Sequence, residues 1–491
     1  MAQSTANNGN HPSLFKVVGL GSAGVDYLAS VSSFPIPDSK MRTDTLEVQG
    51  GGNCANALTA VARLGLSASL ITKIGDDGLG DGIIRELQAE GVDTSCVLRA
   101  EGRPSPFTYI IVDSSGGTRT CIHTPSAPLE PSEMRPELMD AALTGASIVY
   151  FDGRLTEAAL PLARRARGAG IPVLVEAERL RPNLELLLAE ADYVVTSANF
   201  PQEFTGESDL GDAILATAQR LPAAKLLITT LGSRGSVLID RSTAAAALHD
   251  GSHGLCLGTH LTAHLQQSRT HNPSPGSSVP DSSEEPCGRS GSSSSSGDNS
   301  SSSSSRSEGG SSGSSNSQTP DYITPAGCKI QRGGVYSTDG AVRLRFTSNR
   351  DRQVSAKNAA AAAASAARLN ADARNAGRYE LSASESSSSS SSGVSTVTAT
   401  VMLAAAACLP KEAVVDTTGA GDAFIGSVVY ALATGLGCAR MLQLASLVAA
   451  CKCTRLGARP GLPHRDALPQ DLLSEQGHNS AGEGQPSGIQ D

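Results

Sequence analysis

The sequence contains no tryptophan, and phenylalanine and tyrosine contribute only eight residues each to a chain of 491. It also lacks an excess of basic side chains, since 39 Lys and Arg residues stand against 48 Asp and Glu, a formal net charge of −9. Proteins that bind nucleic acid gain much of their affinity by neutralising phosphates with Lys and Arg. The composition therefore argues against a nucleic-acid partner.

Long apolar runs are missing as well. None approaches the roughly 20 residues that span a bilayer, so the sequence predicts no membrane partner. The first residues, MAQSTANNGNHPS, have neither the charged nor the apolar region of a secretory signal, and no arginine precedes Arg42. We expect a cytoplasmic protein, and a plastid location stays open although no clear transit peptide is present.

Two parts of the chain, residues 14–240 and 395–465, alternate apolar strand-like runs with helical patterns. This alternation predicts a doubly wound α/β domain with a mainly parallel sheet and helices on both faces. Residues 241–394 are rich in Ser, Gly and Ala, a composition that buries too little apolar surface to fold, so we expect a largely disordered low-complexity insertion. Residues 1–13 and 466–491 are predicted to be disordered ends.

One segment breaks the alternation of strands and helices. The run from Phe107 to His123 has a Gly-Gly pair near its centre and predicts a β-hairpin. A hairpin does not fit easily into a parallel sheet. We therefore expect residues 107–123, with a further strand at about 43–50, to form a small accessory sheet outside the main core.

The strongest chemical signal is the run VDTTGAGDAF at residues 415–424. An apolar strand, residues 413–415, is predicted to end in this glycine loop, and a helix is predicted to begin within it. The free N–H groups of a first helical turn attract anions, and glycines let the backbone approach a phosphate closely. Asp422, at the same helix start, could accept the proton of an attacking hydroxyl. The run therefore suits phosphoryl transfer to an alcohol, but a tight strand–helix turn explains it equally well.

A second glycine run, GGGNCANA at residues 50–57, opens a predicted helix whose small residues permit close packing. Its three glycines would leave backbone exposed to a ligand, and Asn56 can both donate to and accept from a sugar hydroxyl. The alternative is a glycine loop that only turns the chain.

Together these runs resemble the signatures of a known family. GGNCANALTAVARLG is similar to the N-terminal signature of the PfkB carbohydrate kinases, the ribokinase-like family, and DTTGAGDAF resembles their C-terminal signature. The resemblance covers about residues 15–240 and 395–465, and it implies a ribokinase-like fold in which the small sheet is a lid over the sugar. FDGR at 151–154 and VLVEAER at 173–179 look most like the ketohexokinase-like branch and related plant and algal sugar kinases.

The resemblance implies a role for each matching position. Asp422 matches the catalytic base, and the amides of Gly419, Ala420 and Gly421 match the anion hole of the family. The positions implied for the substrate and the nucleotide form two further sets. Sugar hydroxyls would be bound by Asp26, Gly51, Gly52 and Asn56, and ATP by Thr230, Gly232, Gly235, Asp416 and Thr418.

The resemblance also implies Mg²⁺ together with ATP, and it allows a monovalent cation such as K⁺. The family commonly carries an Asn-x-x-Glu motif that helps to organise the magnesium and the phosphates. The corresponding stretch here is NFPQE at residues 199–203, so the acid comes one position later than in the motif. We assign Asn199 and Glu203 to the metal on this shifted match.

The stretch GLGSAGVDY, residues 19–27, also has the G-x-G-x-x-G spacing of a dinucleotide-binding turn. That turn needs its last glycine inside a helix, but Pro35 and Pro37 leave room for only about a turn of helix after Gly24. We interpret these glycines instead as residues that bring the backbone close to a sugar, beside Asp26.

The sequence thus predicts an ATP-dependent carbohydrate kinase, a phosphotransferase that moves the γ-phosphate of ATP to a sugar hydroxyl. Two alternatives stay open: a nucleoside kinase on the same fold, and a catalytically silent relative that serves as a scaffold. We expect the protein to act as a monomer or as a homodimer paired through the lid.

Overall fold

The computed structural model describes residues 15–113, 115–116, 118–242, 261, 322–324, 327–337, 342–346 and 395–474. The predicted disordered N-terminus, the serine tracts of the insertion and the end of the C-terminal tail lie outside these residues. No helix in the described ranges is both long and apolar enough to cross a membrane.

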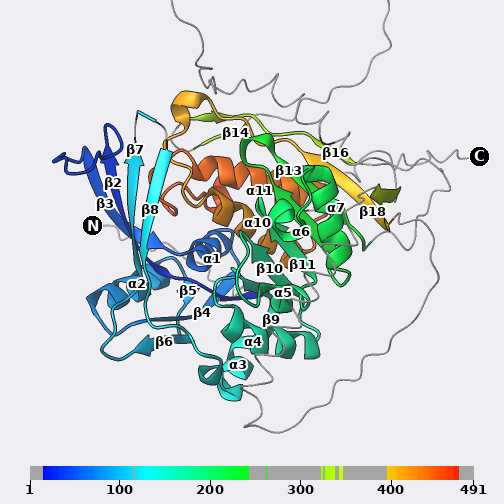
Figure 1. The fold of residues 1–491 in the computed structure, drawn as a ribbon, viewed down its shortest axis with the longest axis horizontal. Helices are drawn as coiled ribbons and strands as arrows, with labels where there is room; N and C mark the ends of the chain where they lie inside the picture. The colour runs from blue at the N-terminus through cyan, green and yellow to red at the C-terminus, as the bar shows by residue number, and fades with distance from the viewer. Residues whose placement is uncertain are drawn as a thin grey trace, which may run out of the picture.

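The described residues form a twelve-stranded sheet through the middle of the molecule (Figure 1). The neighbours β4, β1, β9, β10, β11 and β12 are parallel, and β13 and β18 continue the sheet in antiparallel pairing. This confirms the predicted doubly wound, mainly parallel sheet. Its strands are β1 (Lys16–Leu20), β4 (Ser67–Gly75), β5 (Val92–Asp93), β6 (Val97–Ala100), β9 (Ala146–Phe151), β10 (Val173–Ala177), β11 (Tyr193–Thr196), β12 (Leu226–Thr230), β13 (Ser236–Asp240), β16 (Val335–Ser337), β17 (Val342–Phe346) and β18 (Ser395–Ala404).

Helices cover both faces of the sheet and give the domain two apolar cores. The first core includes α1 (Asn53–Arg63), α2 (Gly78–Ala89), α10 (Ala420–Thr434) and α11 (Cys438–Lys452). The second includes α3 (Pro136–Leu143), α4 (Thr156–Gly168), α5 (Leu184–Leu188), α6 (Phe200–Thr205) and α7 (Leu210–Arg220). The small residues of α1 permit the predicted close packing, and the partner is α10, where a Cβ on Gly426 would lie 2.5 Å from the carbonyl oxygen of Ala57.

A separate four-stranded sheet, which we call the lid, stands beside the main sheet (Figure 1). Its order is β3-β2-β7-β8, from β2 (Gly24–Val31), β3 (Thr45–Gly51), β7 (Phe107–Asp113) and β8 (Thr118–Thr124). The predicted hairpin and the strand near residues 43–50 are both present. The sequence missed β2, which begins at Gly24, although the prolines at 35 and 37 had excluded a long helix there.

Parts of the segments predicted to be disordered belong to the domain. β16 and β17 pair with β18, and a small hairpin of β14 (Tyr322–Ile323) and β15 (Lys329–Ile330) buries Tyr322 and Ile330 in the first core. Beyond residue 465, three leucines are buried. They are Leu468, Leu472 and Leu473. Composition missed these pieces because they are short apolar stretches beside polar sequence.

The strand predicted at residues 413–415 is not formed. Residues Lys411–Ala413 make a 3₁₀ turn, and Val414 and Val415 are exposed. The backbone N–H of Val415 donates to the carbonyl of Cys453 (2.9 Å) rather than to a neighbouring strand. The glycine loop therefore follows an irregular segment held against the end of α11.

Candidate active site

The strand order of the sheet reverses at β1, which pairs with β4 on one side and with β9 on the other. Ligands of open α/β sheets bind outside the carboxyl ends of the strands at such a point. Here Asp152, just beyond β9, accepts hydrogen bonds from the backbone N–H and the hydroxyl of Ser22, just beyond β1, both 2.7 Å. A Cβ on Gly21 would overlap the Asp152 carboxylate, so glycine is required there.

The other glycines of the GLGSAGVDY stretch also face protein atoms. A Cβ on Gly19 would meet Cys54 and Leu58 of α1, and one on Gly24 would meet the carbonyl oxygen of Pro106. Packing thus explains these glycines, and the interpretation that they bring the backbone close to a sugar stays a prediction. They let α1 and the loop after β9 approach the end of β1.

The predicted anion loop is anchored by a buried ion pair. Asp416 accepts hydrogen bonds from the N–H and hydroxyl of Thr418 (2.9 and 2.7 Å) and from the N–H of Gly457 (2.9 Å). Lys452, fully buried, donates to the carbonyl of Asp416 (2.6 Å). Burial acts to raise the pKa of Asp416, but the charge of Lys452 and these hydrogen bonds outweigh it and lower the pKa. Asp416 and Thr418, which we predicted beside ATP, thus bond to each other and shape the loop.

Gly419 is the N-cap residue of α10, and its φ of +74° and its close contact with Ala458 both require glycine. The amide of Ala420 closes the turn by donating to the carbonyl of Thr417 (3.2 Å). The amides of Gly419 and Gly421 flank it, so the predicted anion-hole residues lie together at this helix start. The positive end of the helix dipole favours an anion here.

Asp422 lies in the first turn of α10 and is buried, with 8% of its surface exposed. One carboxylate oxygen, Oδ2, accepts a hydrogen bond from Nδ2 of Asn56 at 2.8 Å. Burial raises the pKa of Asp422 to about 7, although the Asn56 hydrogen bond and the charge of Arg154 act to lower it. A carboxyl group with a pKa near neutrality is suited to accept a proton from a hydroxyl group.

The residues predicted to bind the sugar lie together between the lid and α1. Asp26 of β2 is buried on the inner face of the lid, and burial raises its pKa to about 6 against the charge of Arg459 and a hydrogen bond from Thr108. A Cβ on Gly51 would overlap the Asp26 carboxylate. Gly52 has a φ of +92° and packs against Ser22 and Ala23, so both positions need glycine.

The residues predicted to bind ATP through the β12–β13 turn lie at the same edge of the sheet. The Thr230 hydroxyl, at the end of β12, donates to the carbonyl of Thr196 (3.1 Å). Gly232 and Gly235 have φ values of +61° and +97°, and a Cβ on Gly235 would collide with the carbonyl of Ala404. The structure thus explains both glycines by backbone geometry, and their contact with nucleotide stays a prediction.

The residues predicted to bind metal sit at the start of α6, directly after β11. Asn199 is the N-cap residue, Glu203 follows about one turn later, and both are exposed. Within the described ranges no group of three or more His, Cys, Asp and Glu side chains could hold a metal ion. Mg²⁺ commonly keeps several waters and takes one or two carboxylates with substrate phosphates. An exposed carboxylate at this edge therefore fits an ion that arrives with ATP, and the assignment stays a prediction.

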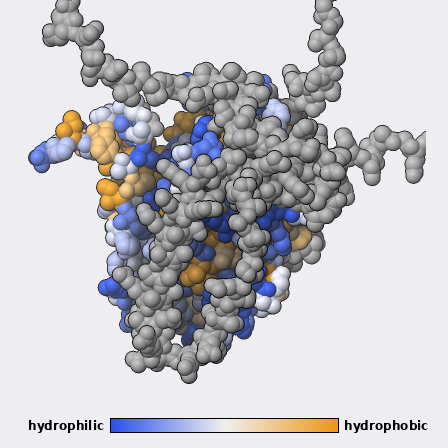
Figure 2. All heavy atoms as spheres, turned by 45° about the vertical axis from the view of Figure 1, so that its right-hand side comes forward, coloured by the Kyte–Doolittle hydropathy of each residue, from blue (hydrophilic) through white to orange (hydrophobic). Residues whose placement is uncertain are grey.

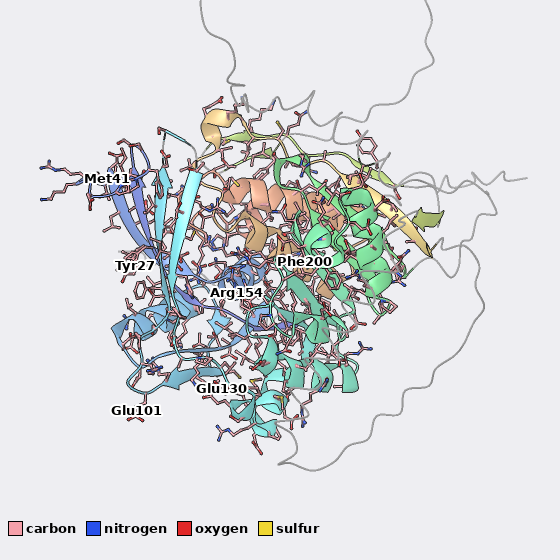
Figure 3. The ribbon with its side chains drawn as sticks, in the orientation of Figure 1. Tyr27, Met41, Glu101, Glu130, Arg154 and Phe200 are labelled. Carbon is pink, nitrogen blue, oxygen red and sulfur yellow. The ribbon has the colours of Figure 1, made fainter. Side chains whose placement is uncertain are left out.

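Arg154 was not among the predicted site residues, although its FDGR run was part of the resemblance. It lies near the centre of the molecule (Figure 3), where it donates to Glu178 (2.9 Å) and to the side-chain oxygen of Asn53 (3.1 Å). Its Nε is buried and has no hydrogen-bond partner among the described residues. This nitrogen can therefore take an oxygen atom of a ligand.

A further buried acid, Glu176, lies close enough to Asp422 to interact with its charge. Glu176, at the end of β10, accepts a hydrogen bond from the hydroxyl of Tyr150 (2.9 Å). Burial, with the charges of Asp422 and Asp152, raises the pKa of Glu176 well above its usual range. The same burial that isolates Glu176 from water therefore disfavours its charged form.

Two more arginines escaped the sequence reasoning because their partners are far away in the chain. Arg119 of the lid strand β8 donates to the hydroxyl of Thr417, 298 residues later, at 2.6 Å. Arg459 donates to the side-chain oxygen of Asn56, 403 residues earlier, at 3.0 Å. No local pattern in the sequence marks either arginine as a site residue.

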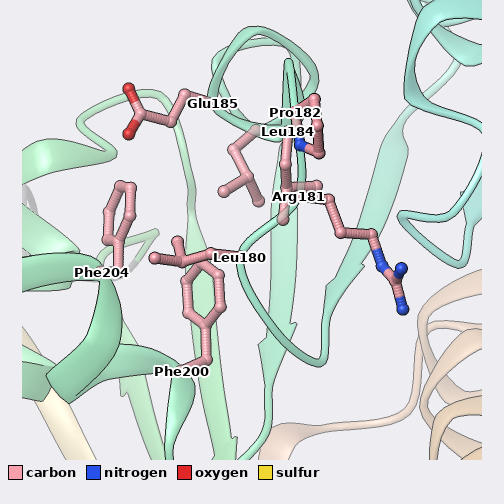
Figure 4. A pocket seen from close by; sticks show the side chains of 8 residues that line it. Leu180, Arg181, Pro182, Leu184, Glu185, Phe200 and Phe204 are labelled. Atoms are coloured by element: carbon pink, nitrogen blue, oxygen red, sulfur yellow. The ribbon is translucent and has the colours of Figure 1, made fainter. Parts of the chain in front are cut away.

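A hollow of about 370 Å³ lies between the β10–α5 loop and α6, where the rings of Phe200 and Phe204 and the side chain of Leu180 line it (Figure 4). None of the residues predicted for catalysis, sugar, ATP or metal lines this hollow. The candidate active site is therefore the region around Asp422, not this hollow.

The sequence is similar to that of known proteins. The family described as "pfkB family carbohydrate kinase" matches the chain over residues 15–249 and 387–465. A fructokinase of Solanum tuberosum is 28% identical over 240 residues, 47% of this chain and 72% of that protein. A bifunctional ribokinase/ribose-5-phosphate isomerase A of Fructilactobacillus sanfranciscensis is 25% identical over 231 residues, 45% of this chain and 42% of that protein. The chain thus matches less than half of this second relative's length.

The fold also has solved counterparts. The structure of Arabidopsis thaliana ribokinase complexed with ribose and ATP has a TM-score of 0.52 and 16% identity, covering 93% of this chain and 98% of that one. A doubly wound sheet with a small lid, and a glycine loop opening α10, define a ribokinase-like kinase fold. Because the family match spans more than half of the sequence, the chain belongs to the pfkB family of carbohydrate kinases.

Proposed function

We propose that the protein is an ATP-dependent carbohydrate kinase in which Asp422 is the general base. Asp422 takes the proton of a sugar hydroxyl, and the oxygen attacks the γ-phosphorus of ATP in line. The new P–O bond to the sugar forms as the bond to ADP breaks. The observation that carries this proposal is a buried carboxylate with a pKa near neutrality in the first turn of α10, beside the amides of Gly419 and Gly421.

The surroundings of Asp422 supply the other requirements of this reaction. In this proposal Asp26 and the second N–H of Asn56 would bind sugar hydroxyls, and Nε of Arg154, which has no partner among the described residues, would bind a sugar or phosphate oxygen. The lid above them would exclude water, which competes with the sugar as acceptor. Glu203, with Asn199, would hold Mg²⁺ together with the phosphates of ATP, and the ion would neutralise their charge.

The outer face of the lid supports a further proposal, that two copies of the chain pair through it. Val48, Tyr27, Tyr109 and Ile122 lie opposite one another across the four strands. At least half of the surface of Val48, Tyr109 and Ile122 is exposed. Hydrophobic residues, in orange, gather on the lid at the left of Figure 2. An apolar sheet face without charges at its centre suits a second identical face.

An acceptor screen tests the proposed activity. The purified protein would be assayed for ADP formation with hexoses, pentoses and the nucleosides adenosine, inosine and cytidine. We expect turnover with one or more sugars. Turnover with nucleosides alone would show that the acceptor is a nucleoside and not a free sugar. No turnover with any acceptor would favour the scaffold alternative.

A further inference from the structure

Arg459 is a buried arginine that the proposed mechanism does not yet use. Its side chain lies between the start of α1 and α2, with 3% of the residue exposed. Nε donates to Oδ1 of Asn56 (3.0 Å), one terminal nitrogen to Glu86 (2.9 Å) and the other to the carbonyl of Gly51 (3.2 Å). Arg459 therefore touches both the glycine loop and the amide that contacts Asp422.

The amide of Asn56 has two orientations, and its neighbours permit only one. Arg459 has only donors, so it requires the amide oxygen on its side. Asp422, when ionised, has only acceptors, so it requires the amide nitrogen on the other side. The two hydrogen bonds, at 3.0 and 2.8 Å, meet both requirements. Without the Arg459 donor, only Asp422 orients the amide, and it does so only while its carboxyl group is ionised.

We propose that Arg459 is a positioning residue that acts through Asn56 and fixes the amide so that Nδ2 always faces the catalytic carboxylate. The Asn56 hydrogen bond occupies Oδ2 of Asp422, and we assign Oδ1 to the hydroxyl of the acceptor. This inference rests on the proposed role of Asp422 as the base.

The chemical consequence concerns the proton affinity of Asp422. A donor on the ionised carboxylate favours the charged form, so a correctly oriented Asn56 keeps the base available at lower pH. A flipped amide would place its oxygen against the carboxylate and disfavour the charged form. Loss of the Arg459 donor is therefore expected to move the acidic limb of activity to higher pH.

Asp26 of β2 loses the charge of Arg459 equally in the Gln and Met variants. Other groups around Asp422 influence the same limb, and the substitutions at Arg459 leave them in place. They come from each element that packs against Asp422: Cys54 on α1, Tyr150 on β9, Asp152 and Arg154 in the loop after β9, Glu176 on β10, Glu178 in the loop after β10, and Lys452 on α11.

Three substitutions at one position separate the possible roles of Arg459. Gln places an N–H donor where Arg carries Nε but removes the charge. Met has the same reach with a methyl group at that point, and it removes both donor and charge. Lys keeps the charge but places a methylene there. The proposal therefore predicts that the acidic limb of the uncharged Gln variant lies closer to the wild type than that of the charged Lys variant. A purely electrostatic role predicts the opposite order.

The experiment measures kcat/KM for the preferred sugar from pH 5.5 to 9 in the wild type and the three variants, with thermal unfolding as a check on folding. We expect the acidic limb of Arg459→Met to lie about one pH unit above that of Arg459→Gln, an extra loss of about tenfold at low pH that recovers at high pH, because both variants lose the charge and only Gln keeps the donor. The acidic limb of Arg459→Lys should move in the same direction as that of Arg459→Met. The Lys variant replaces the Met variant in the comparison if the Met variant does not fold.

Two results would overturn the inference. One is an acidic limb at the same pH in Arg459→Gln and Arg459→Met. The other is an acidic limb at the wild-type pH in Arg459→Lys together with a shifted limb in Arg459→Gln. Asp422→Asn separates this failure from a failure of the proposed function: an inactive Asp422→Asn protein with unshifted Arg459 variants rejects only the positioning role. A fully active Asp422→Asn protein rejects the base and the positioning role together.

Discussion

Asp422 and Asn56 illustrate what single residues reveal before a structure is known. Both stand in short glycine-rich runs whose chemistry can be read locally, and the structure brings their side chains to 2.8 Å. Arg459 could not be found in this way, because its role depends on a partner 403 residues away. The raised pKa of Asp422 was also beyond the sequence, since burial by distant segments causes it.

Burial of Asp422 predicts a pH-dependent stability. Its pKa is about 7 in the folded chain and near 4 when unfolded, so its favourable contribution is complete at low pH and is lost as the pH rises through 7. We expect Asp422→Asn to increase the free energy of unfolding relative to the wild type by on the order of 2 kcal/mol above pH 7.5, and by much less near pH 4.

Denaturant unfolding at a series of pH values measures this difference. The matched control is Asp44→Asn, which removes a carboxylate from an exposed position of the lid. A gain that is the same at every pH in both variants would contradict the account of Asp422.

At the scale of elements, local patterns predicted α10, its glycine loop and the lid hairpin, because helix starts and tight turns are encoded by neighbouring residues. They misplaced the strand at 413–415, since Val415 bonds to the carbonyl of Cys453 and finds no strand beside it. They also missed β16, a three-residue strand that is defined by its antiparallel pairing with β18. Strand pairing depends on distant segments, and sequence periodicity does not report it.

The hydrogen bond from Arg119 to Thr417 links the lid to the loop before α10 and predicts a measurable effect on the sugar. An exposed hydrogen bond of this kind contributes about 1 kcal/mol, which corresponds to about fivefold. We expect Arg119→Ala to raise the KM for the sugar by about that factor, because the closed lid becomes less favourable. Steady-state kinetics at saturating ATP would measure it.

Thr417→Val removes the other partner of the same hydrogen bond and should have an effect of similar size. The double variant should be no worse than either single variant. Effects that add in the double variant would show that the two side chains act separately.

At the scale of the whole molecule, the apolar outer face of the lid predicts a dimer. The variant Val48→Asp/Tyr109→Asp places like charges at the centre of that face, and we expect it to sediment as a monomer where the wild type sediments as a dimer. Leu186→Asp is the control, because Leu186 is an exposed leucine on α5, outside the lid, and its variant should stay dimeric. A monomeric wild type over the micromolar range would contradict the pairing.

The measurement that tests the central claim most directly compares wild-type protein with Asp422→Asn in one assay. Sugar phosphate and ADP would be followed with the acceptor that the screen identifies, and ATP binding would be measured by calorimetry in parallel. The account predicts that the variant loses at least about a thousandfold in kcat while it folds and binds ATP nearly as the wild type does. Sugar phosphorylation by Asp422→Asn at the wild-type rate would contradict it.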